Sequence, residues 1–296
     1  MSKTLVLENS LPEFTKDRSR AIGAILVELG RLSPLEVEKI QQFASKQNLR
    51  FGDAALKLQL LTEDDVNLAV AQQFKYPILR KGGEGGVSDE VIAAYQPQSV
   101  AVEALRVLRS QLGLRWNTPN ERKSLVILSS DRGDGRSWLA ANLATVFAQM
   151  GDRVLLIDGD MRHPRQHELF KLNNSVGLSA LLTGRAGKEA VVRIHPQLRL
   201  FVLPAGFLPP NPQELLGREV FDLVLKMFAS QYDLVIFDAP ATSEAADAQI
   251  LASRVDAGVM LVRRNYSRAA QVKSAMQNMA ESGIHVIGSV INEYGS

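Results

Sequence analysis

The sequence contains no cysteine in its 296 residues. Disulfide bonds, thiolate zinc sites and cysteine nucleophiles are therefore excluded. An excess of charge is also absent, since 34 Lys and Arg residues against 32 Asp and Glu residues leave a formal net charge of +2. Such a balance favours neither a nucleic acid nor an anionic membrane surface as a partner.

Long hydrophobic runs are missing as well. No apolar stretch approaches the ~18 residues that a membrane span needs, and the first residues show no basic stretch followed by an apolar one. Hydrophobic residues make up 46% of the chain and charged residues 22%, which is typical of folded rather than disordered proteins. We therefore expect a cytoplasmic protein, and its length suggests about two domains.

A repeat with an offset of 29 residues distinguishes the first part of the chain. Its two copies begin at residues 22–29 and 51–58. Each copy is typical of a short helix, a turn and a second helix that starts at an N-cap, Ser33 or Thr62. Glu36 and Asp65 follow these caps at the spacing of a capping box. We predict a helical domain over residues 18–79.

The pattern changes after a polar, glycine-rich stretch. We predict a flexible linker at residues 80–98 and a second domain at residues 99–296. In this domain continuous apolar runs (125–128, 154–157, 200–203, 234–237, 259–262 and 286–287) alternate with helical stretches (137–150, 212–230 and 268–282). Continuous runs indicate strands that are buried on both faces. The alternation predicts an α/β fold with a doubly wound, mainly parallel sheet, whose ligands bind at the carboxyl ends of the strands.

A glycine-rich turn at residues 129–137 follows the first of these runs. A turn that leads into a helix in this way presents backbone N–H groups to phosphate oxygens. Its spacing is that of the phosphate-binding loop (P-loop) G-x-x-x-x-G-K-[ST], with Ser130 replacing the first glycine and Arg136 the lysine. The residues expected to hold a nucleotide are Gly133, Asp134, Gly135, Arg136, Ser137 and Trp138. Trp138 is placed to stack on a base, although core packing explains it equally well.

Carboxylates follow two other runs. Asp158 and Asp160 come after one of them, and Asp238 comes after another. Loop capping explains each acid when it is taken alone. Acids that converge on one edge of a sheet, however, repel one another unless a cation or a shared proton lies between them. Together with the P-loop, they predict a site for Mg²⁺ and a nucleotide.

Residues 129–170 resemble the bacterial tyrosine kinases, which are P-loop ATPases related to the MinD/ParA type. The acidic motif of that family is matched by Leu-Ile-Asp-Gly-Asp-Met-Arg at residues 156–162. Its E-x-x-R-x-x-R ring-forming motif is similar to Glu103, Arg106 and Arg109, a spacing that an exposed ion pair along one helix also explains. The layout resembles the EpsG-type chain length determinant protein tyrosine kinases of exopolysaccharide biosynthesis.

This resemblance implies transfer of the ATP γ-phosphoryl group to a tyrosine, with Mg²⁺ as cofactor. It implies that Ser137, Asp158 and Asp238 hold the metal and that Arg136 and the acids Asp158 and Asp160 take part in the transfer. Asp158 is the preferred acceptor of the tyrosine proton, but which of those two acids is the base and which organises the metal stays open.

The resemblance also leaves an alternative. Arg136 puts a planar guanidinium where the family has a compact ammonium, and the tail offers only Tyr294 where the family has a tyrosine-rich segment. Both departures favour a scaffold that binds a nucleotide and assembles the polysaccharide export machinery without transferring phosphate.

The partners that the resemblance implies are a membrane-embedded chain length determinant (Wzz-like) protein, which would recruit the kinase to the inner face of the membrane, and further copies of the chain in a homo-oligomer.

The repeat resembles the N-terminal (MshEN-like) domain of type II secretion and pilus ATPases. Some members of that domain family bind cyclic di-GMP through paired R-L-G…Q motifs. Arg50, Gly52 and Gln73 fit one such motif, whereas Gln59 replaces a glycine and the first copy lacks the arginine. A helical docking module is the alternative.

Overall fold

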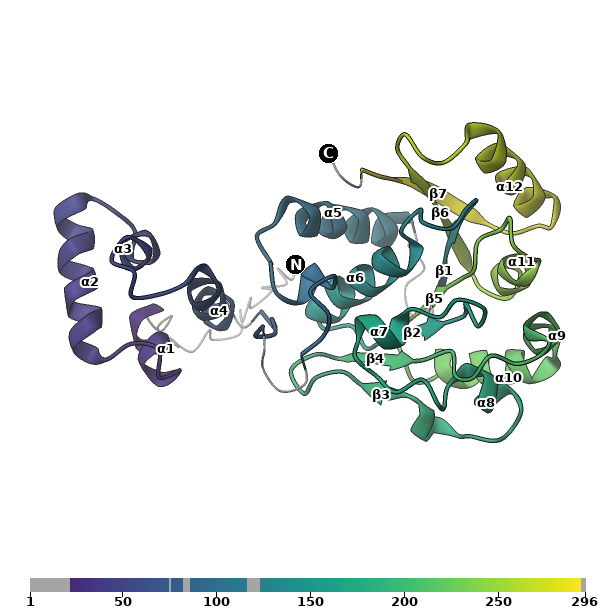
Figure 1. The fold of residues 1–296 in the computed structure, drawn as a ribbon, viewed down its shortest axis with the longest axis horizontal. Helices are drawn as coiled ribbons and strands as arrows, with labels where there is room; N and C mark the ends of the chain where they lie inside the picture. Colours follow the sequence, from purple (N-terminus) through teal and green to yellow (C-terminus); the bar gives the residue numbers. More distant parts are fainter. Residues whose placement is uncertain (1–21, 75, 82–85, 116–122, 294–296) are drawn as a thin grey trace, which may run out of the picture. The chain divides into compact units, whose positions relative to one another are not determined.

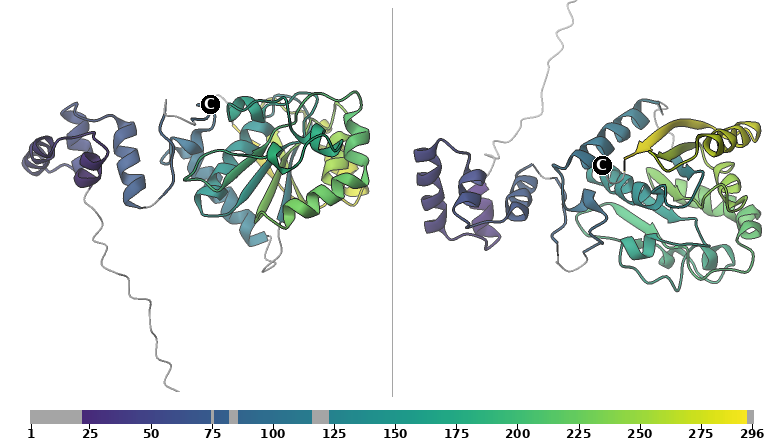
Figure 2. Two further views of the ribbon diagram at one scale, coloured as in Figure 1. Left: turned by 90° about the horizontal axis from the view of Figure 1, so that it is seen from below. Right: turned by 45° about the horizontal axis from the view of Figure 1, so that its top comes forward.

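The computed structural model describes residues 22–74, 76–81, 86–115 and 123–293. The chain forms two compact units, Met1–Tyr76 and Pro77–Ser296, and both can be followed in Figure 1 and Figure 2. Within the described residues, no helix combines the length and the apolar character that crossing a membrane requires.

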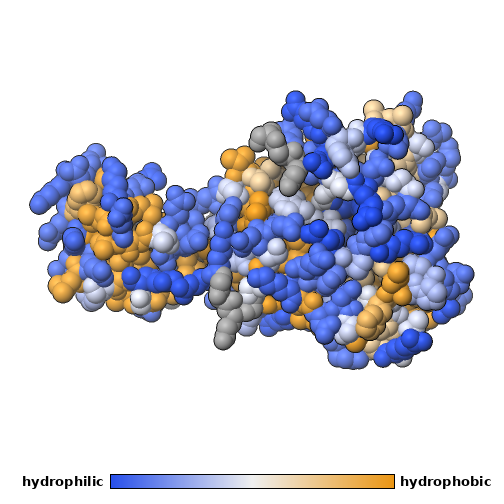
Figure 3. All heavy atoms as spheres, in the orientation of Figure 1, coloured by the Kyte–Doolittle hydropathy of each residue, from blue (hydrophilic) through white to orange (hydrophobic). Residues whose placement is uncertain are grey.

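The described part of the first unit consists of short helices. They are α1 (Ile22–Glu28), α2 (Pro34–Gln47), α3 (Phe51–Lys57) and α4 (Glu63–Gln73). Helix α1 packs against α4, and α2 packs against α3. A small core that includes Leu26, Ile40 and Ala54 is fully buried between them. Figure 3 shows that hydrophobic atoms of this unit also reach its surface on the face in view.

Both predicted capping boxes are present. The Ser33 hydroxyl accepts a hydrogen bond from the Glu36 backbone N–H at 3.3 Å, and the Glu36 carboxylate accepts one from the Ser33 N–H at 2.7 Å. Thr62 and Asp65 form the same pair of bonds. Each box satisfies two backbone donors at a helix start, which stabilises the helix by ~1 kcal/mol.

The repeat has a packing reason as well as a capping one. A Cβ atom on Gly23 would lie 2.8 Å from Cγ1 of Val37, and one on Gly52 would lie 3.0 Å from Cγ1 of Val66. The two glycines therefore allow the first helix of each repeat to approach the second closely. Their recurrence at the same offset is explained by helix packing, whatever else the repeat does.

The second unit is built on a seven-stranded sheet with the order β3-β4-β2-β5-β1-β6-β7. The strands are β1 (Lys123–Ser129), β2 (Val154–Asp158), β3 (Val192–Arg193), β4 (Leu200–Leu203), β5 (Leu234–Asp238), β6 (Ala257–Arg263) and β7 (Val286–Asn292). Every neighbouring pair is parallel except β3 with β4. The predicted α/β fold with a mainly parallel sheet is confirmed.

Helices cover both faces of this sheet, as Figure 1 and Figure 2 show. The helices are η1 (Ile92–Ala94), α5 (Val100–Arg115), α6 (Arg136–Gln149), α7 (Gln166–Leu169), α8 (Leu178–Leu182), η2 (Lys188–Ala190), α9 (Pro212–Gly217), α10 (Glu219–Ala229), α11 (Asp247–Ala252) and α12 (Ala269–Glu281). Leu125 and Ile127 of β1 belong to the core under α5 and α6, whereas Val126 and Leu128 belong to the core under α8 to α12. Successive residues of a strand thus enter different cores, which explains why the apolar runs are continuous.

The structure corrects the predicted linker at residues 80–98. Val87, Val91 and Tyr95 are buried in the core under α6, and the Tyr95 hydroxyl donates to the Val87 carbonyl at 2.7 Å. The glycines suggested a linker, but the apolar residues that follow them bury enough surface to order the chain. The second unit accordingly begins at Pro77.

Two further details differ from the prediction. The helix expected at 212–230 is two helices, because Arg218 between α9 and α10 has extended backbone angles. Strand β3 is not predicted, since its two residues are too short for any periodicity to show.

Candidate nucleotide-binding and active site

A cavity of about 500 Å³ opens beside the P-loop, near the carboxyl ends of β1 and β2. The predicted residues Gly133, Gly135, Arg136, Ser137, Trp138 and Asp160 line it together with Glu90, Ala101, Arg132, His163, Arg165, Leu169, Arg263, Asn292 and Glu293. This is the edge of the sheet at which a doubly wound fold binds its ligands. Most of the predicted nucleotide residues are therefore brought together here.

The start of α6 has the features of an anion-binding site. Gly133 and Gly135 have positive φ values of 83° and 102°, and Gly135 is the N-cap residue of α6 without a side-chain capping bond. The first backbone N–H groups of a helix have no partner inside the helix and carry the positive end of its dipole. Here no capping side chain competes for them, so phosphate oxygens are the expected acceptors.

Replacement of Gly135 by alanine is expected to lower nucleotide affinity at least tenfold. An added Cβ would lie 2.6 Å from Nδ2 of Asn292, and the φ of 102° disfavours any side chain. The loop would have to shift away from the geometry that presents its N–H groups. Binding of a fluorescent ATP analogue would measure the change. Gly184→Ala serves as the control, because Gly184 also has a positive φ but lies outside the cavity with open space around its Cβ position.

Arg136 lies folded within the loop. Its Nε donates to the Ala239 carbonyl at 2.8 Å, and its Nη1 donates to the Asp131 carbonyl at 2.7 Å and to the Ser129 hydroxyl. Only 8% of the residue is exposed. The guanidinium thus joins the P-loop to the ends of β1 and β5, a role that the sequence did not indicate.

Asp158 and Asp238 face each other across neighbouring strands. They are register partners on β2 and β5, and both are fully buried. Burial raises the pKa of Asp238 to about 6, although the Arg136 guanidinium acts in the opposite direction. Burial also raises the pKa of Asp158 well above its usual value, and the charge of Asp238 adds to this effect. Two buried acids side by side favour a cation or a proton between them.

The three predicted acids have different surroundings. The Asp158 carboxylate accepts backbone hydrogen bonds from Asp160, Arg165 and Gln166, and it therefore holds the segment after β2 in place. Asp160 lines the cavity, although it is 4% exposed, and its Oδ1 accepts from the His163 N–H at 2.9 Å. Of the acids after β2, Asp160 is the one that faces the cavity.

Gln166 is a site residue that sequence reasoning missed. Its Nε2 donates to Oδ2 of Asp238 at 2.8 Å and to the Ser137 carbonyl at 3.1 Å. Gln166 thereby links the acid at the end of β5 to the first turn of α6. The available signal was its position four residues after Arg162, the last residue of the acidic motif, but no local pattern says what a glutamine there contacts.

The arrangement fits Mg²⁺ bound together with a nucleotide. Oδ1 of Asp238 is buried without a hydrogen-bond partner, and so is Oε1 of Gln166, while a Ser137 hydrogen bond also reaches Asp238. No group of three or more His, Asp or Glu side chains among the described residues is arranged to hold a metal alone. Mg²⁺ keeps several water and phosphate ligands, so Ser137 and Asp238 suffice as protein ligands.

Residues at the end of β6, just after it and on β7 bind the outer side of the P-loop. The Ser267 hydroxyl donates to Oδ1 of Asp134 at 2.7 Å, and Asn292 donates to the Asp134 carbonyl at 2.8 Å. Arg263 donates to the Gly133 carbonyl at 3.0 Å. The Asp134 side chain is fully buried and fixes the loop, while the contact of its backbone N–H with the nucleotide stays a prediction.

Trp138 has both of its predicted environments. It lines the cavity and also packs, partly buried, against the core under α6. A base that stacks on its exposed part would be compatible with this packing.

The predicted oligomerisation residues lie on α5. Arg106 and Glu103 form an ion pair at 2.9 Å, and Arg109 donates to the Val146 carbonyl at 3.1 Å. Arg109 therefore ties α5 to α6 within the chain. Val100 and Leu114 on the same helix are 88% and 78% exposed.

Tyr294, the predicted phosphoacceptor, lies outside the described residues.

In the first unit, Arg50 is the exposed N-cap residue of α3, and Gln73 is the last residue of α4. Gln59 has a positive φ of 55°, like Gly30 at the equivalent position of the first copy. Positions 30 and 59 are thus equivalent turn positions with a left-handed backbone, occupied by glycine in the first copy and by glutamine in the second.

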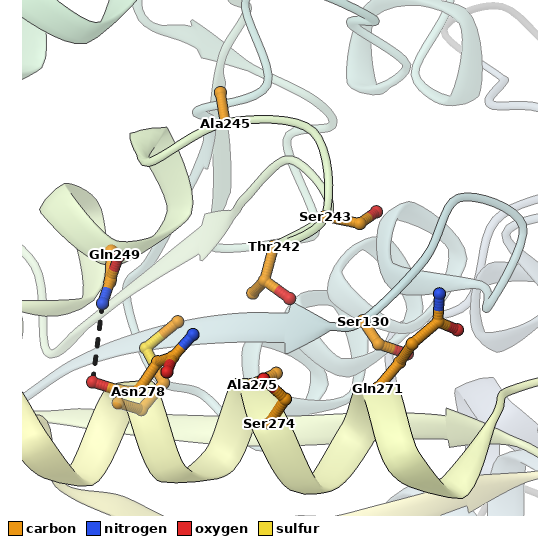
Figure 4. A pocket seen from close by; sticks show the side chains of 10 residues that line it. Ser130, Thr242, Ser243, Ala245, Gln249, Gln271, Ser274, Ala275 and Asn278 are labelled. Carbon is orange, nitrogen blue, oxygen red and sulfur yellow. Dashed lines mark hydrogen bonds between the residues drawn. The ribbon is translucent and has the colours of Figure 1, made fainter.

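A smaller cavity of about 160 Å³ adjoins the start of the P-loop at Ser130 (Figure 4). It lies between α12 and the loop that follows β5, and its lining includes Thr242, Gln271 and Asn278. All of its lining residues are uncharged. It therefore offers neither the acids nor the cations that a magnesium-bound phosphate group needs.

Comparisons with known proteins show which proteins this chain is similar to. The family described as "Cellulose biosynthesis protein BcsQ" matches residues 123–290. The tyrosine-protein kinase YwqD of Bacillus subtilis (strain 168) is 36% identical over 214 residues, which are 72% of this chain and 90% of that protein.

Solved structures extend the likeness to three dimensions. The kinase domain of the Escherichia coli tyrosine kinase ETK matches with a TM-score of 0.66 and 30% identity, over 70% of this chain and 82% of that chain. The septum site-determining protein MinD of Pyrococcus horikoshii OT3 matches with a TM-score of 0.51 and 20% identity, over 59% of this chain and 71% of that chain. The likeness to MinD concerns the fold, and it confirms the predicted MinD/ParA-like P-loop architecture.

Proposed function

Because the chain belongs to the family of bacterial tyrosine kinases, we propose that it transfers the γ-phosphoryl group of ATP to tyrosine hydroxyl groups with the help of Mg²⁺. The observation that carries the proposal is that two features meet at Ser137, which lines the cavity and forms a hydrogen bond with the buried Asp238. The uncapped start of α6 offers donors for phosphate, and Asp238 offers a buried oxygen without a partner for the metal.

Each residue has a proposed role in the transfer. The N–H groups at the start of α6 bind the phosphate oxygens, and Ser137 and Asp238 hold Mg²⁺, which neutralises phosphate charge. Asp160 accepts the proton of the attacking tyrosine, since it is the one of the three acids at strand ends that lines the cavity. A bond forms between the tyrosine oxygen and the γ-phosphorus, the bond to the β–γ bridging oxygen breaks, and ADP leaves.

A second candidate function is supported by Arg136. Its guanidinium is held by acceptors from the P-loop and two strand ends, so it is less free than a lysine to follow the moving phosphoryl group. On this alternative the chain binds ATP and changes its assembly state without transferring phosphate.

The wider role that we propose is control of exopolysaccharide chain length, together with a membrane-embedded chain length determinant (Wzz-like) protein and further copies of this chain. The EpsG-type resemblance supports the role, and the exposed Val100 and Leu114 on α5 support contact between copies. For the N-terminal unit we propose docking of a partner, with cyclic di-GMP as a further candidate ligand.

The test is phosphate incorporation from Mg-ATP into a random Glu-Tyr copolymer, followed with an anti-phosphotyrosine antibody. We expect the wild type to label the copolymer and Asp160→Asn to do so at least ~100-fold more slowly, the usual range for loss of a general base. Asp64→Asn, at an exposed position of α4, is the matched control. ATP binding without any labelling would reject the kinase and leave the scaffold.

A further inference from the structure

Tyr266 differs from the other described tyrosines in its exposure. The sequence has five tyrosines. Tyr95 and Tyr232 are 4% and 5% exposed, whereas Tyr266 is 53% exposed. Tyr76 is only partly exposed, and Tyr294 lies outside the described residues. Within the described part of the chain, Tyr266 is therefore the tyrosine that another molecule can reach most easily.

The Tyr266 side chain is in contact with the P-loop. Its hydroxyl donates to the Arg132 carbonyl at 3.2 Å, and a Cβ on Gly133 would lie 3.1 Å from that hydroxyl oxygen. The Arg263 guanidinium lies 4.6 Å from the centre of the Tyr266 ring and also binds the Gly133 carbonyl. Tyr266 thus closes over the outside of the loop at the residues just before α6.

The hydroxyl does not line the cavity proposed for the nucleotide. Tyr266 lines a neighbouring hollow of about 470 Å³ with Asp131, Arg132, Glu244 and Arg268 among its other residues. Arg132 of the P-loop lines both this hollow and the cavity beside Ser137 and Asp160, whereas Tyr266 lines the hollow alone. A phosphoryl group could therefore reach Tyr266 most directly from a second copy of the chain.

We propose that Tyr266 is a phosphoacceptor, modified by a second copy, and that its phosphorylation releases the outer side of the P-loop. The inference rests on the kinase activity proposed above. The Tyr266 oxygen attacks the γ-phosphorus of ATP held by the other copy, the bond to the β–γ bridging oxygen breaks, and ADP leaves. The phenolic proton passes to Asp160 of that second copy.

Electrostatics determine the effect on the loop. A phosphorylated hydroxyl loses its donor and gains about two negative charges, so it can no longer bind the Arg132 carbonyl. Asp131 and Glu244 in the same hollow repel it. The guanidinium groups of Arg132, Arg263 and Arg268 attract it, and that of Arg132 lies 3.4 Å from Glu244. The lost bond to the Arg132 carbonyl therefore releases the outer side of the loop, and nucleotide affinity falls.

The experiment uses two distinguishable forms of the full chain. The wild type is the donor, and an affinity-tagged Asp160→Asn chain, which is not expected to phosphorylate itself, is the acceptor. After incubation with Mg-ATP, the tagged chain is re-isolated and its phosphotyrosines are mapped by mass spectrometry. The Glu-Tyr copolymer is labelled in the same reaction. We expect phosphate on Tyr266 of the acceptor, and its retention when Tyr294→Phe is added.

The outcomes separate this inference from the proposed function. A labelled copolymer with an unmodified Tyr266, or with phosphate on Tyr294 alone, overturns the inference and leaves the kinase standing. An unlabelled copolymer with an unmodified acceptor overturns both. Phosphorylated and unphosphorylated acceptor are then compared for binding of a fluorescent ATP analogue, and at least a fivefold weaker binding is expected. Unchanged binding would overturn the release of the loop.

Discussion

Asp238→Asn is expected to reduce phosphoryl transfer at least ~1,000-fold and, at the same time, to stabilise the protein in the absence of Mg²⁺ and nucleotide at pH 8. The catalytic loss follows because the amide lacks the charge that holds the metal near the transferred group. The stabilisation follows because the wild-type carboxylate is buried and has a raised pKa of about 6. A buried charge without its cation is unfavourable.

The sign of the pH dependence can be worked out from that pKa. In the unfolded chain Asp238 titrates at its ordinary 3.8, so the folded state binds the proton more tightly. Above pH 6 the ionised carboxylate lowers the free energy of unfolding by up to about 3 kcal/mol, the equivalent of the pKa difference. This penalty shrinks as the pH falls from 6 towards 4. The advantage of Asp238→Asn should shrink with it.

Thermal unfolding between pH 4 and pH 8, in the presence of EDTA, measures the effect. Asp238→Asn should melt several degrees above the wild type at pH 8 and within a degree of it at pH 4. The exposed Asp64→Asn removes one of the acids in the first turn of α4, so it should lower the melting temperature slightly or leave it unchanged and should not raise it at pH 8. A lower melting temperature for Asp238→Asn at pH 8 would show that the contacts of its carboxylate with Gln166 and Ser137 outweigh the cost of burial.

Two substitutions of Arg136 should separate the contribution of its positive charge from that of its guanidinium geometry. Arg136→Ala removes the donor from the Ala239 and Asp131 carbonyls and from the Ser129 hydroxyl. The Asp131 carbonyl keeps its bond from the Ser129 hydroxyl, but a buried acceptor that loses its partner, such as the Ala239 carbonyl, costs about 1–3 kcal/mol. We expect a lower melting temperature, at least tenfold weaker ATP binding and the loss of detectable phosphoryl transfer.

Arg136→Lys should behave differently. An ammonium cannot span acceptors that come from the loop and from two strands, so the loop is less tightly held and the melting temperature falls. The same flexibility lets the charge reach the transferred phosphate. We therefore expect ATP binding to be retained and phosphoryl transfer to be at least as fast as in the wild type. The exposed Arg185→Lys is the control. A tenfold or greater loss of transfer in Arg136→Lys would show that the guanidinium itself is required.

Local patterns in the sequence were sufficient for much of the fold. The apolar runs give the six longer strands, and five of these are largely buried because a strand covered on both faces needs apolar residues at every position. The sixth, β7, lies at the edge of the sheet and is only partly buried. Ser33 and Thr62 mark helix starts, because a cap and its acid interact within four residues. The position of the P-loop follows for the same reason, since its glycines and the start of α6 are neighbours in sequence.

Contacts between distant residues were not available from any local pattern. Residues 80–98 carry a linker-like composition, yet Val87 and Val91 are buried by contact with α6. Asp158 and Asp160 look equivalent in the sequence. Only the fold turns Asp158 towards the backbone after β2 and leaves Asp160 on the cavity.

The sequence by itself determined which chemistry this protein carries: a phosphate loop, three acids at strand ends and a sheet that brings them together. The tertiary structure decided how those groups are held. Strand β1 lies between β5 and β6, and this order lets Arg136 bind the end of β5 and lets Tyr266, after β6, bind the loop. These bonds join residues more than 100 positions apart. Their formation depends on strand order and on the fit of side chains, which no short stretch of sequence records.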